Sequence, residues 1–428
     1  MDAPGIAAPV WPPHKRLIFR FLFLYFVLYC FPFPLDAFEF LDSVASPYYN
    51  LIDRLIPLVG KKWFHLTAHV AFPKFDKVDD SFYGLVFMYF ILILSALGTV
   101  IWSVIDRRAK NHERLFQLLK LYLRYFLASY LFGYGFVKVF PSQFQAITTS
   151  RLTMTVGDQS PMLLAWNFMG HSVVMQRLNG LLEVIAGLLL LFRRTTTLGA
   201  ILSTAVFSFV VMMDFCFNVP IRLLSSHLLL ISVLLVLTDG RRLMNVFVLN
   251  RPASAAVYRP LINHPVGRKV FSASLVVLAF CLLYSNVTKG LDAERAFGQT
   301  APRGPLYGVY DTDYFLRNRD TIPASKTDSL RWKQLVIDGR AWNQSSVIKF
   351  NNDKRASYTT NADTAKRMLS IQSLTDTTKK YFFSYIVPDS THIILKGRWN
   401  SDTLEVLMTK YDLNNYLLHR EKFKWITD

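Results

Sequence analysis

Seven long apolar stretches constrain this chain more than any other feature of its sequence. They lie at 15–34, 82–105, 117–140, 176–193, 196–215, 221–238 and 268–287. A helix needs roughly 20 mostly apolar residues to cross the hydrocarbon layer of a bilayer. We therefore predict an α-helical polytopic membrane bundle of about seven transmembrane helices.

The composition agrees with a membrane protein. Of the 428 residues, 52% are hydrophobic and only 18% are charged, whereas a soluble domain carries about 25% charged residues. The chain has 48 Lys and Arg against 30 Asp and Glu, a formal net charge of +18. In a soluble protein this excess would suggest nucleic-acid binding. In a membrane protein, basic residues collect in loops on the cytoplasmic side, so we expect a lipid bilayer as partner and no nucleic acid.

The first stretch has two interpretations. It follows His14, Lys15 and Arg16, as the apolar segment of a signal peptide would. No small-residue cleavage site follows it directly, and Pro32 and Pro34 are typical of the end of a helix. We interpret it as a retained first span.

The positions of basic residues predict an orientation. Clusters at the start, after the second span (107–114), after the fourth (193–194) and after the sixth (241–269) all fall on one side of a seven-span bundle. Such loops are typically cytoplasmic. We therefore predict a multi-pass protein of the cytoplasmic (inner) membrane of a prokaryote, with a cytoplasmic N-terminus and an extracytoplasmic C-terminal domain.

The order of these segments predicts the domain organisation. We expect a tail and first span (1–34), an outer loop long enough to fold back on the membrane surface (35–81), a second span with a cytoplasmic loop (82–114), four central spans (115–238), a basic cytoplasmic loop (239–267), a seventh span (268–287) and an extracytoplasmic β-rich domain (288–428).

The C-terminal segment has a different pattern. Its apolar stretches are short, rich in β-branched and aromatic residues, and separated by turn residues, at 331–337, 346–352, 367–373, 381–387 and 391–397. Such stretches are typical of strands. Their regular spacing predicts an all-β domain, a small antiparallel sandwich or barrel. We expect a short helix at 401–411 to close it.

An ionisable residue within a predicted span costs about 2.5–3.5 kcal/mol, and two such residues stand out. Lys138 follows Gly133 and Gly135 near the outer end of the third span, and Glu183 lies about two turns inside the fourth. Lys138 has two interpretations, since its amine either pairs with Glu183 or snorkels to the interface. The shorter side chain of Glu183 is expected to face the interior of the bundle.

Further polar residues are predicted at the same depth as that pair. Asp214, Arg222 and His227 lie at the outer ends of the fifth and sixth spans, and His171 lies on the connection before the fourth. These residues join Lys138 and Glu183 as candidates for a polar membrane site. They form either a cavity for a polar headgroup, a quinone ring or a partner segment, or connections that are polar because they meet water.

No motif identifies catalytic chemistry. The chain has no phosphate-binding glycine loop, HExxH or GxSxG, and no second ligand stands at helical spacing from His227, so we predict no metal site. Cys30 and Cys216 both fall near the outer face, where they either pair or stay free thiols. Arg20 and Arg124 lie nearer the inner side, where snorkelling is expected.

The third to sixth spans resemble a known family. GYGFVKVF (133–140) is followed about forty residues later by NGLLEVIAGLLLLFRRTTTLGAILSTAVF (179–207). This pattern resembles the DoxX-like four-helix membrane proteins, in which Gly-x-x-Lys precedes a helix with Glu, Gly, a Leu run and a basic turn. Lys138 and Glu183 match the family's two charged positions. The resemblance covers residues 115–238, a DoxX-like four-helix core.

This chain departs from the DoxX-like pattern in having a longer outer segment, two preceding spans, and a seventh span followed by a β domain. The resemblance implies a membrane partner of a redox enzyme, such as a subunit of thiosulfate:quinone oxidoreductase, or, among distant relatives, a chaperone or cargo receptor. A carboxylase-like membrane domain is another relative to consider, although its catalytic pattern is not recognisable here.

Two functions from different classes follow. The first is an accessory or quinone- or lipid-interacting component of a membrane redox system, with no cofactor of its own and a redox partner on the extracytoplasmic side. The second is a non-catalytic membrane chaperone, assembly or cargo-binding factor whose β domain binds a client protein. A transporter is a weaker third, because no inverted repeat is evident. Whether the protein is an enzyme stays open, and an oxidoreductase subunit rests on the resemblance alone.

Overall fold

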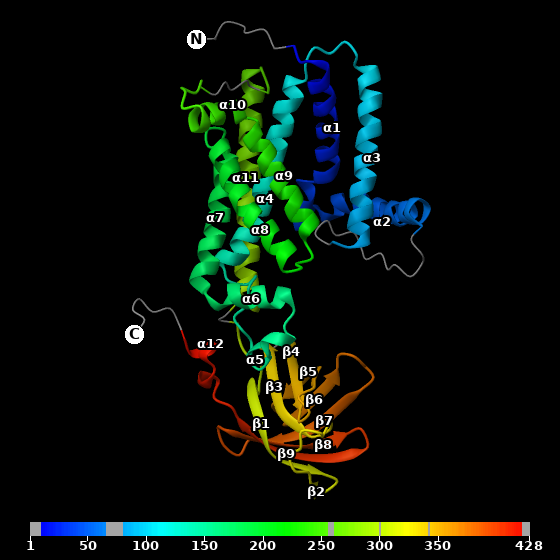
Figure 1. Ribbon diagram of the computed structural model, residues 1–428, viewed down its shortest axis with the longest axis vertical. Coiled ribbons are helices and arrows are strands. Elements are labelled where there is room, and N and C mark those ends of the chain that lie inside the picture. Colours follow the sequence, from blue (N-terminus) through cyan, green and yellow to red (C-terminus); the bar gives the residue numbers. More distant parts are fainter. Residues whose placement is uncertain (1–9, 66–79, 256–260, 299–300, 341–342, 422–428) are drawn as a thin grey trace. The chain divides into compact units, whose positions relative to one another are not determined.

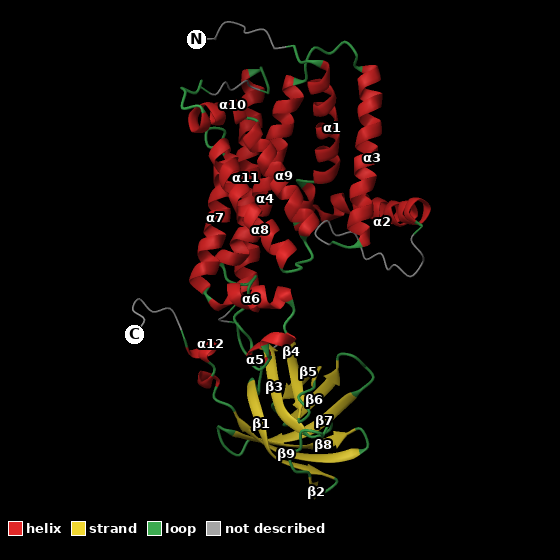
Figure 2. Ribbon diagram, in the orientation of Figure 1, coloured by secondary structure: helices red, strands yellow, loops and turns green. Residues whose placement is uncertain are grey.

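The computed structural model describes residues 10–65, 80–255, 261–298, 301–340 and 343–421. The chain forms two compact units. The helical unit combines 1–139 with 178–290, and the barrel unit combines 140–177 with 291–428. Figures 1 and 2 show helices throughout the first unit and the strands gathered in the second.

The helical unit is built from long helices and a short one of four residues. They are α1 (Pro13–Cys30), α2 (Asp42–Phe64), α3 (Phe82–Ile105), α4 (Glu113–Val139), α7 (Val173–Leu191), α8 (Thr196–Cys216), α9 (Arg222–Leu237), α10 (Gly240–Leu243) and α11 (Pro265–Phe297), of which α7 and α11 extend into the barrel unit. Each of the seven apolar stretches lies wholly or largely on one of these helices.

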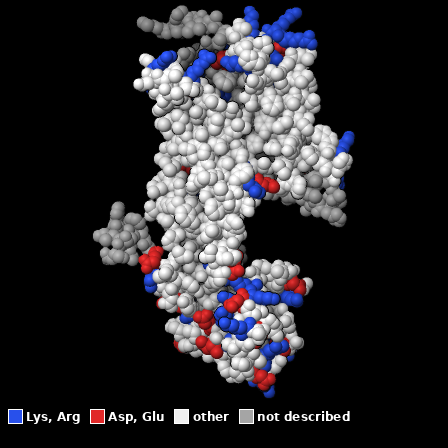
Figure 3. Space-filling model, in the orientation of Figure 1, with Lys and Arg blue, Asp and Glu red and all other residues white. Residues whose placement is uncertain are grey.

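Five helical stretches among the described residues are long and apolar enough to cross a membrane: Pro13–Ala37, Phe82–Ile105, Val173–Leu191, Thr196–Cys216 and Pro265–Phe297. A sixth is added if Arg222–Leu237 and Gly240–Val248, bent by 68°, form one broken span. The helix α4 is not among them. Figure 3 shows a largely uncharged belt around the middle of the helical unit. The protein is therefore membrane-associated, while seven crossings stay a prediction.

The segment predicted as an outer loop contains the 23-residue helix α2, which lies across α3 in Figure 1. Its inner face buries Ile52 and Ile56, and exposed apolar residues recur every seven positions at Val44, Leu51 and Leu58. Beside that stripe is an exposed polar arc of Ser43, Asn50, Arg54 and Lys61. An apolar stripe flanked by basic and polar residues is typical of a helix lying in the membrane interface.

The described residues of the barrel unit form nine antiparallel strands. They are β1 (Gly308–Arg317), β2 (Asp320–Thr321), β3 (Trp332–Arg340), β4 (Asn343–Phe350), β5 (Arg355–Asp363), β6 (Met368–Ser373), β7 (Lys380–Ile386), β8 (His392–Trp399) and β9 (Asp402–Lys410). From β3 to β9 each strand pairs with the next, and β1 pairs with both β3 and β9, from Tyr310↔Lys410 to Arg317↔Leu404. The result is a closed eight-stranded barrel, with β2 as a short hairpin partner of β1. Of the two predicted architectures, the barrel is the one formed.

The predicted helix at 401–411 is wrong, because this segment is the strand β9. Its buried residues Leu404, Val406 and Met408 alternate with more exposed ones, which is the period of a strand rather than a helix. The strands β1 and β5 were not predicted. β1 has acidic residues and a register shift near Thr312, and β5 buries only Tyr358 and Thr360.

The barrel interior is filled by side chains. Trp332 is fully buried at its centre, with its ring 5.6 Å from Phe383 and 5.1 Å from Trp399. Small barrels of eight strands are just wide enough to be filled in this way. The interior of the barrel is therefore a packed core.

The connection between α4 and α7 packs on the barrel within the same unit. It contains α5 (Thr149–Leu152) and α6 (Pro161–His171). The amide and hydroxyl of Ser150 donate to Oδ2 of Asp338 at 3.3 and 2.7 Å. The Arg355 guanidinium donates to the carbonyls of Ser150 and Thr153 at 2.8 and 2.7 Å. These charge-assisted bonds fix the connection on β3 and β5.

Candidate functional site

A glycine contact between α4 and α7 positions the predicted charged pair. A Cβ added to Gly180 would lie 2.6 Å from the Gly135 carbonyl oxygen, and one added to Gly135 would lie 3.1 Å from that of Gly180. Small residues of this kind let helix backbones approach closely in membranes. Lys138 and Glu183 each follow their glycine by one helical turn, so the crossing brings them together.

Lys138 and Glu183 form a buried ion pair. The Nζ of Lys138 donates to both carboxylate oxygens of Glu183 at 2.8 Å, and the side chains are 7% and 6% exposed. The same Nζ donates to the Tyr134 carbonyl at 3.4 Å and lies 5.6 Å from the centroid of the Tyr134 ring. Of the two interpretations of Lys138, pairing is the one observed, and Glu183 faces the interior as predicted.

A second acid lies close to this pair. Asp214 is 3% exposed, and its Oδ2 has no hydrogen-bond partner among the described residues. The charges of Lys138 and Arg222 act on its carboxylate. Asp80 holds Arg222 in place. Its Oδ2 accepts hydrogen bonds from the Arg222 backbone amide at 2.8 Å and from Arg222 Nε at 2.9 Å. Its Oδ1 accepts a hydrogen bond from the Leu223 amide at 2.8 Å. Four of the predicted site residues thus share one electrostatic environment: Lys138, Glu183, Asp214 and Arg222.

The two predicted histidines do not join it. His227 contacts the Tyr25 hydroxyl through Nε2 at 2.7 Å and the Leu223 carbonyl through Nδ1 at 2.6 Å, and its ring stacks on Tyr29 at 4.2 Å. With both nitrogens engaged, it is a packing residue between α1 and α9. His171 is exposed at the end of α6, in the barrel unit.

A cavity of about 340 Å³ opens at the Lys138 end of the helical unit. Its wall combines aromatic and polar side chains, among them Phe33, Phe126, Tyr130, Tyr134, Asp36, Asn286 and Lys289. Tyr134 joins this cavity to the ion pair, because it lines the cavity and its carbonyl accepts from Lys138. The cavity could not be predicted from the sequence, since its residues come from three distant segments.

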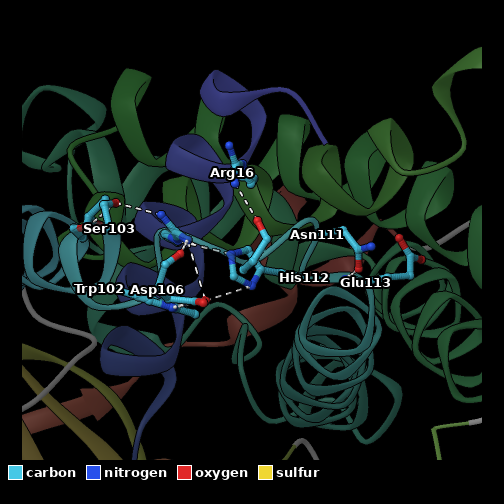
Figure 4. Close-up of polar contacts among 10 residues, drawn as sticks. Arg16, Trp102, Ser103, Asp106, Asn111, His112 and Glu113 are labelled. Carbon is cyan, nitrogen blue, oxygen red and sulfur yellow. Dashed lines mark hydrogen bonds and ion pairs between the residues drawn. The ribbon is translucent and has the colours of Figure 1, made fainter. Parts of the chain in front are cut away.

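The opposite end of the unit holds a polar cluster that was not predicted. Arg20 and Arg124 are each 5% exposed, so the expectation that they snorkel to water is wrong. Arg20 donates from Nε to His112 Nε2 at 3.2 Å, from Nη1 to Ser103 Oγ at 3.0 Å and from Nη2 to the Asp106 carbonyl at 2.7 Å. Figure 4 shows Ser103, Asp106 and His112 gathered around these contacts.

The charge state of His112 follows from this cluster. Burial and the adjacent Arg20 guanidinium hold the pKa of His112 below its usual 6.5. The ring is therefore neutral at pH 7, with Nε2 accepting from Arg20. This contact ties α1 to the start of α4.

The cysteines and other ligating groups form no cluster in the described part of the chain. Cys30 is buried, Cys216 is exposed and Cys281 is half-buried, and no disulfide joins them within the described residues. Over residues 10–65, 80–255, 261–298, 301–340 and 343–421, no three His, Cys, Asp or Glu side chains are grouped so that they could hold a metal ion.

Comparison with known proteins gives one informative match. No family model and no solved structure matches this chain. Over 124 residues it is 32% identical to the uncharacterized protein YwoB of Bacillus subtilis (strain 168), a match that covers 29% of this chain and 79% of YwoB. The name of YwoB assigns no activity, and the DoxX-like resemblance stays a prediction. Because the identity extends over most of its relative's length, the chain belongs to the same family as YwoB.

Proposed function

We propose that this protein is a membrane-anchored accessory component of a redox system that binds the ring of a membrane quinone in the cavity beside the Lys138–Glu183 pair. The observation that carries the proposal is the lining of that cavity, in which aromatic rings and polar groups face one space of about 340 Å³. Small-ligand sites have volumes of about 300–1,000 Å³ and combine an apolar wall with a few polar groups.

The lining suits a flat ring with carbonyl oxygens. The rings of Tyr130 and Tyr134 offer surfaces for stacking, and the Asn286 amide and Lys289 ammonium are donors for carbonyl oxygens. Asn286 Nδ2 donates to the Leu282 carbonyl at 2.8 Å and has a second hydrogen to offer. The ion pair is a positioning element, since it holds the turn of α4 that bears Tyr134.

Binding of a short-chain quinone analogue to the purified full chain tests the proposal. Asn286→Leu removes a donor while keeping the side-chain volume, and one lost hydrogen bond should weaken binding about fivefold. Thr288→Val on the same helix is the control, because Thr288 bonds only to its own helix and does not line the cavity. Absence of binding to the wild type, or equal binding by Asn286→Leu, would contradict the proposal.

The second candidate function is client binding by the barrel. It is favoured by apolar residues on the outer wall, since Phe382, Ile386 and Val387 are 54%, 46% and 50% exposed at β7. A photo-crosslinker placed at 382 in cells should then capture a defined extracytoplasmic protein, and one placed at Lys333 on β3 should not. Capture at 382 together with failure of the quinone analogue to bind would favour this function over the first.

A further inference from the structure

A second and larger cavity lies at the end of α4 opposite Lys138. Its volume is about 880 Å³, and α4, α11 and the connections that follow α7 and α9 surround it. Six basic and two acidic side chains line it: Lys120, Arg124, Arg193, Arg242, Arg268 and Lys269, with Glu113 and Asp239. Figure 3 shows Lys and Arg gathered at this end of the helical unit. The cavity is separate from the proposed quinone site.

The two acids are already engaged. Asp239 accepts from the Thr197 hydroxyl and forms an ion pair with Arg242 at 3.3 Å. Glu113 Oε1 accepts from Gln117 Nε2 at 2.9 Å. Neither carboxylate is placed to neutralise the remaining cations directly.

Several of the cations lack an anionic partner. In the part of the chain that the structure describes, Lys120, Arg268 and Lys269 form no ion pair with a carboxylate, although the charge of Asp239 acts on half-buried Lys120. A partly buried cation with no counter-ion is costly at membrane depth, and this cost falls on Lys120, whereas Arg268 and Lys269 are exposed and open to an incoming ligand. An anion placed among these three side chains would relieve that cost.

The rest of the wall is apolar and includes Leu121, Leu191, Phe271, Leu275 and Val276. A ligand that matches both the basic and the apolar part of the cavity wall carries a negative group and hydrocarbon chains. Basic pockets between transmembrane helices bind anionic lipid headgroups on this principle, and Arg and Lys together are well suited to phosphate.

We propose that this cavity binds an anionic phospholipid, with its phosphate among Lys120, Arg268 and Lys269 and its acyl chains along the apolar wall. The hydroxyl-bearing residues Thr238 and Ser272 also line the cavity and supply donors for a headgroup.

The test compares two double variants of the full chain in nanodiscs of phosphatidylcholine, with and without phosphatidylglycerol. Lys120→Gln with Arg268→Gln removes two cavity charges. Arg107→Gln with Arg108→Gln removes the same charge from exposed residues that do not line the cavity. Phosphatidylglycerol should raise the melting temperature of the wild type and of the Arg107/Arg108 variant. Its affinity for the cavity variant should fall about 30-fold.

Equal phosphatidylglycerol affinity in the cavity variant and the wild type would overturn the proposal. If the cavity variant does not fold, the exposed Lys269→Gln alone should weaken binding about fivefold, while Lys269→Arg should not. The last experiment measures stabilisation of the protein by inorganic phosphate. Stabilisation by phosphate as large as that by phosphatidylglycerol would assign the site to free phosphate and overturn the lipid proposal, whereas no effect of phosphate supports it.

Discussion

Replacing Glu183 by Gln leaves the Lys138 ammonium buried without its anion. Both side chains are less than one-tenth exposed, and two contacts of 2.8 Å join them. Nζ also donates to the Tyr134 carbonyl at 3.4 Å, but a neutral carbonyl cannot replace the charge of a carboxylate. Breaking a buried pair by removing one partner costs about 3–5 kcal/mol. We expect Glu183→Gln and Lys138→Met each to destabilise the helical unit by about that amount.

The double variant separates pairing from simple burial. With both charges removed, no uncompensated charge remains, so its loss should be well below the sum of the single losses, with a coupling energy of about 2–3 kcal/mol. The assay is unfolding of the purified protein in mixed micelles, followed by circular dichroism. Arg107→Met, an exposed residue, is the matched control and should change stability by less than about 0.5 kcal/mol.

Additive losses would refute this reasoning. If the double variant were as unstable as the two single changes combined, the residues would act independently and the pair could not hold α4 against α7. A Glu183→Gln variant as stable as the wild type would also refute the argument, because a buried Lys138 ammonium without an anion should destabilise the fold.

Three further predictions concern other parts of the molecule. Gly180→Ala should destabilise the helical unit by about 1–3 kcal/mol, because its Cβ would meet backbone atoms of α4 at 2.6 and 2.7 Å; Gly240→Ala, which has open space around it, should be neutral in the same unfolding assay. The pKa of His112 is lower in the folded protein than in the unfolded chain. The neutral ring therefore contributes its full stabilisation above the unfolded-state pKa of about 6.5, and this stabilisation is lost as the pH falls through the folded-state pKa. The melting temperature should drop on acidification, and it should drop less for His112→Gln. Trp332→Ala should cost the barrel about 3–5 kcal/mol, measured by near-ultraviolet circular dichroism, and an unchanged melting curve would contradict the packing described.

Much of the helical unit was predictable because the physics of the bilayer is local in sequence. A run of about 20 apolar residues is sufficient to indicate a helix. The Lys138–Glu183 pair could be named as one of two alternatives for a related reason, since depth along two antiparallel spans can be counted from the sequence. Neither step requires knowledge of distant contacts.

The features that were missed depend on tertiary contacts. Asp80 caps α9 from more than one hundred residues away, so no local sequence pattern predicts this cap. Arg20 and Arg124 were expected in water, but carbonyls and side chains of neighbouring helices satisfy them. The strand β9 was mistaken for a helix because DTLEVLMTK contains good helix formers, and its partners β8 and β1 decide its state.

The closure of the barrel limits how any partner can recognise it. Many proteins recruit peptides by adding a strand to an open sheet edge, with main-chain hydrogen bonds supplying the affinity. Here β1 and β9 pair with each other, so that edge is closed. The strand β2 has only two residues and is too short to pair with a strand of another chain. If the barrel binds a client as proposed, recognition would rest mainly on side chains, so its specificity would change by point substitution at the surface without altering the fold.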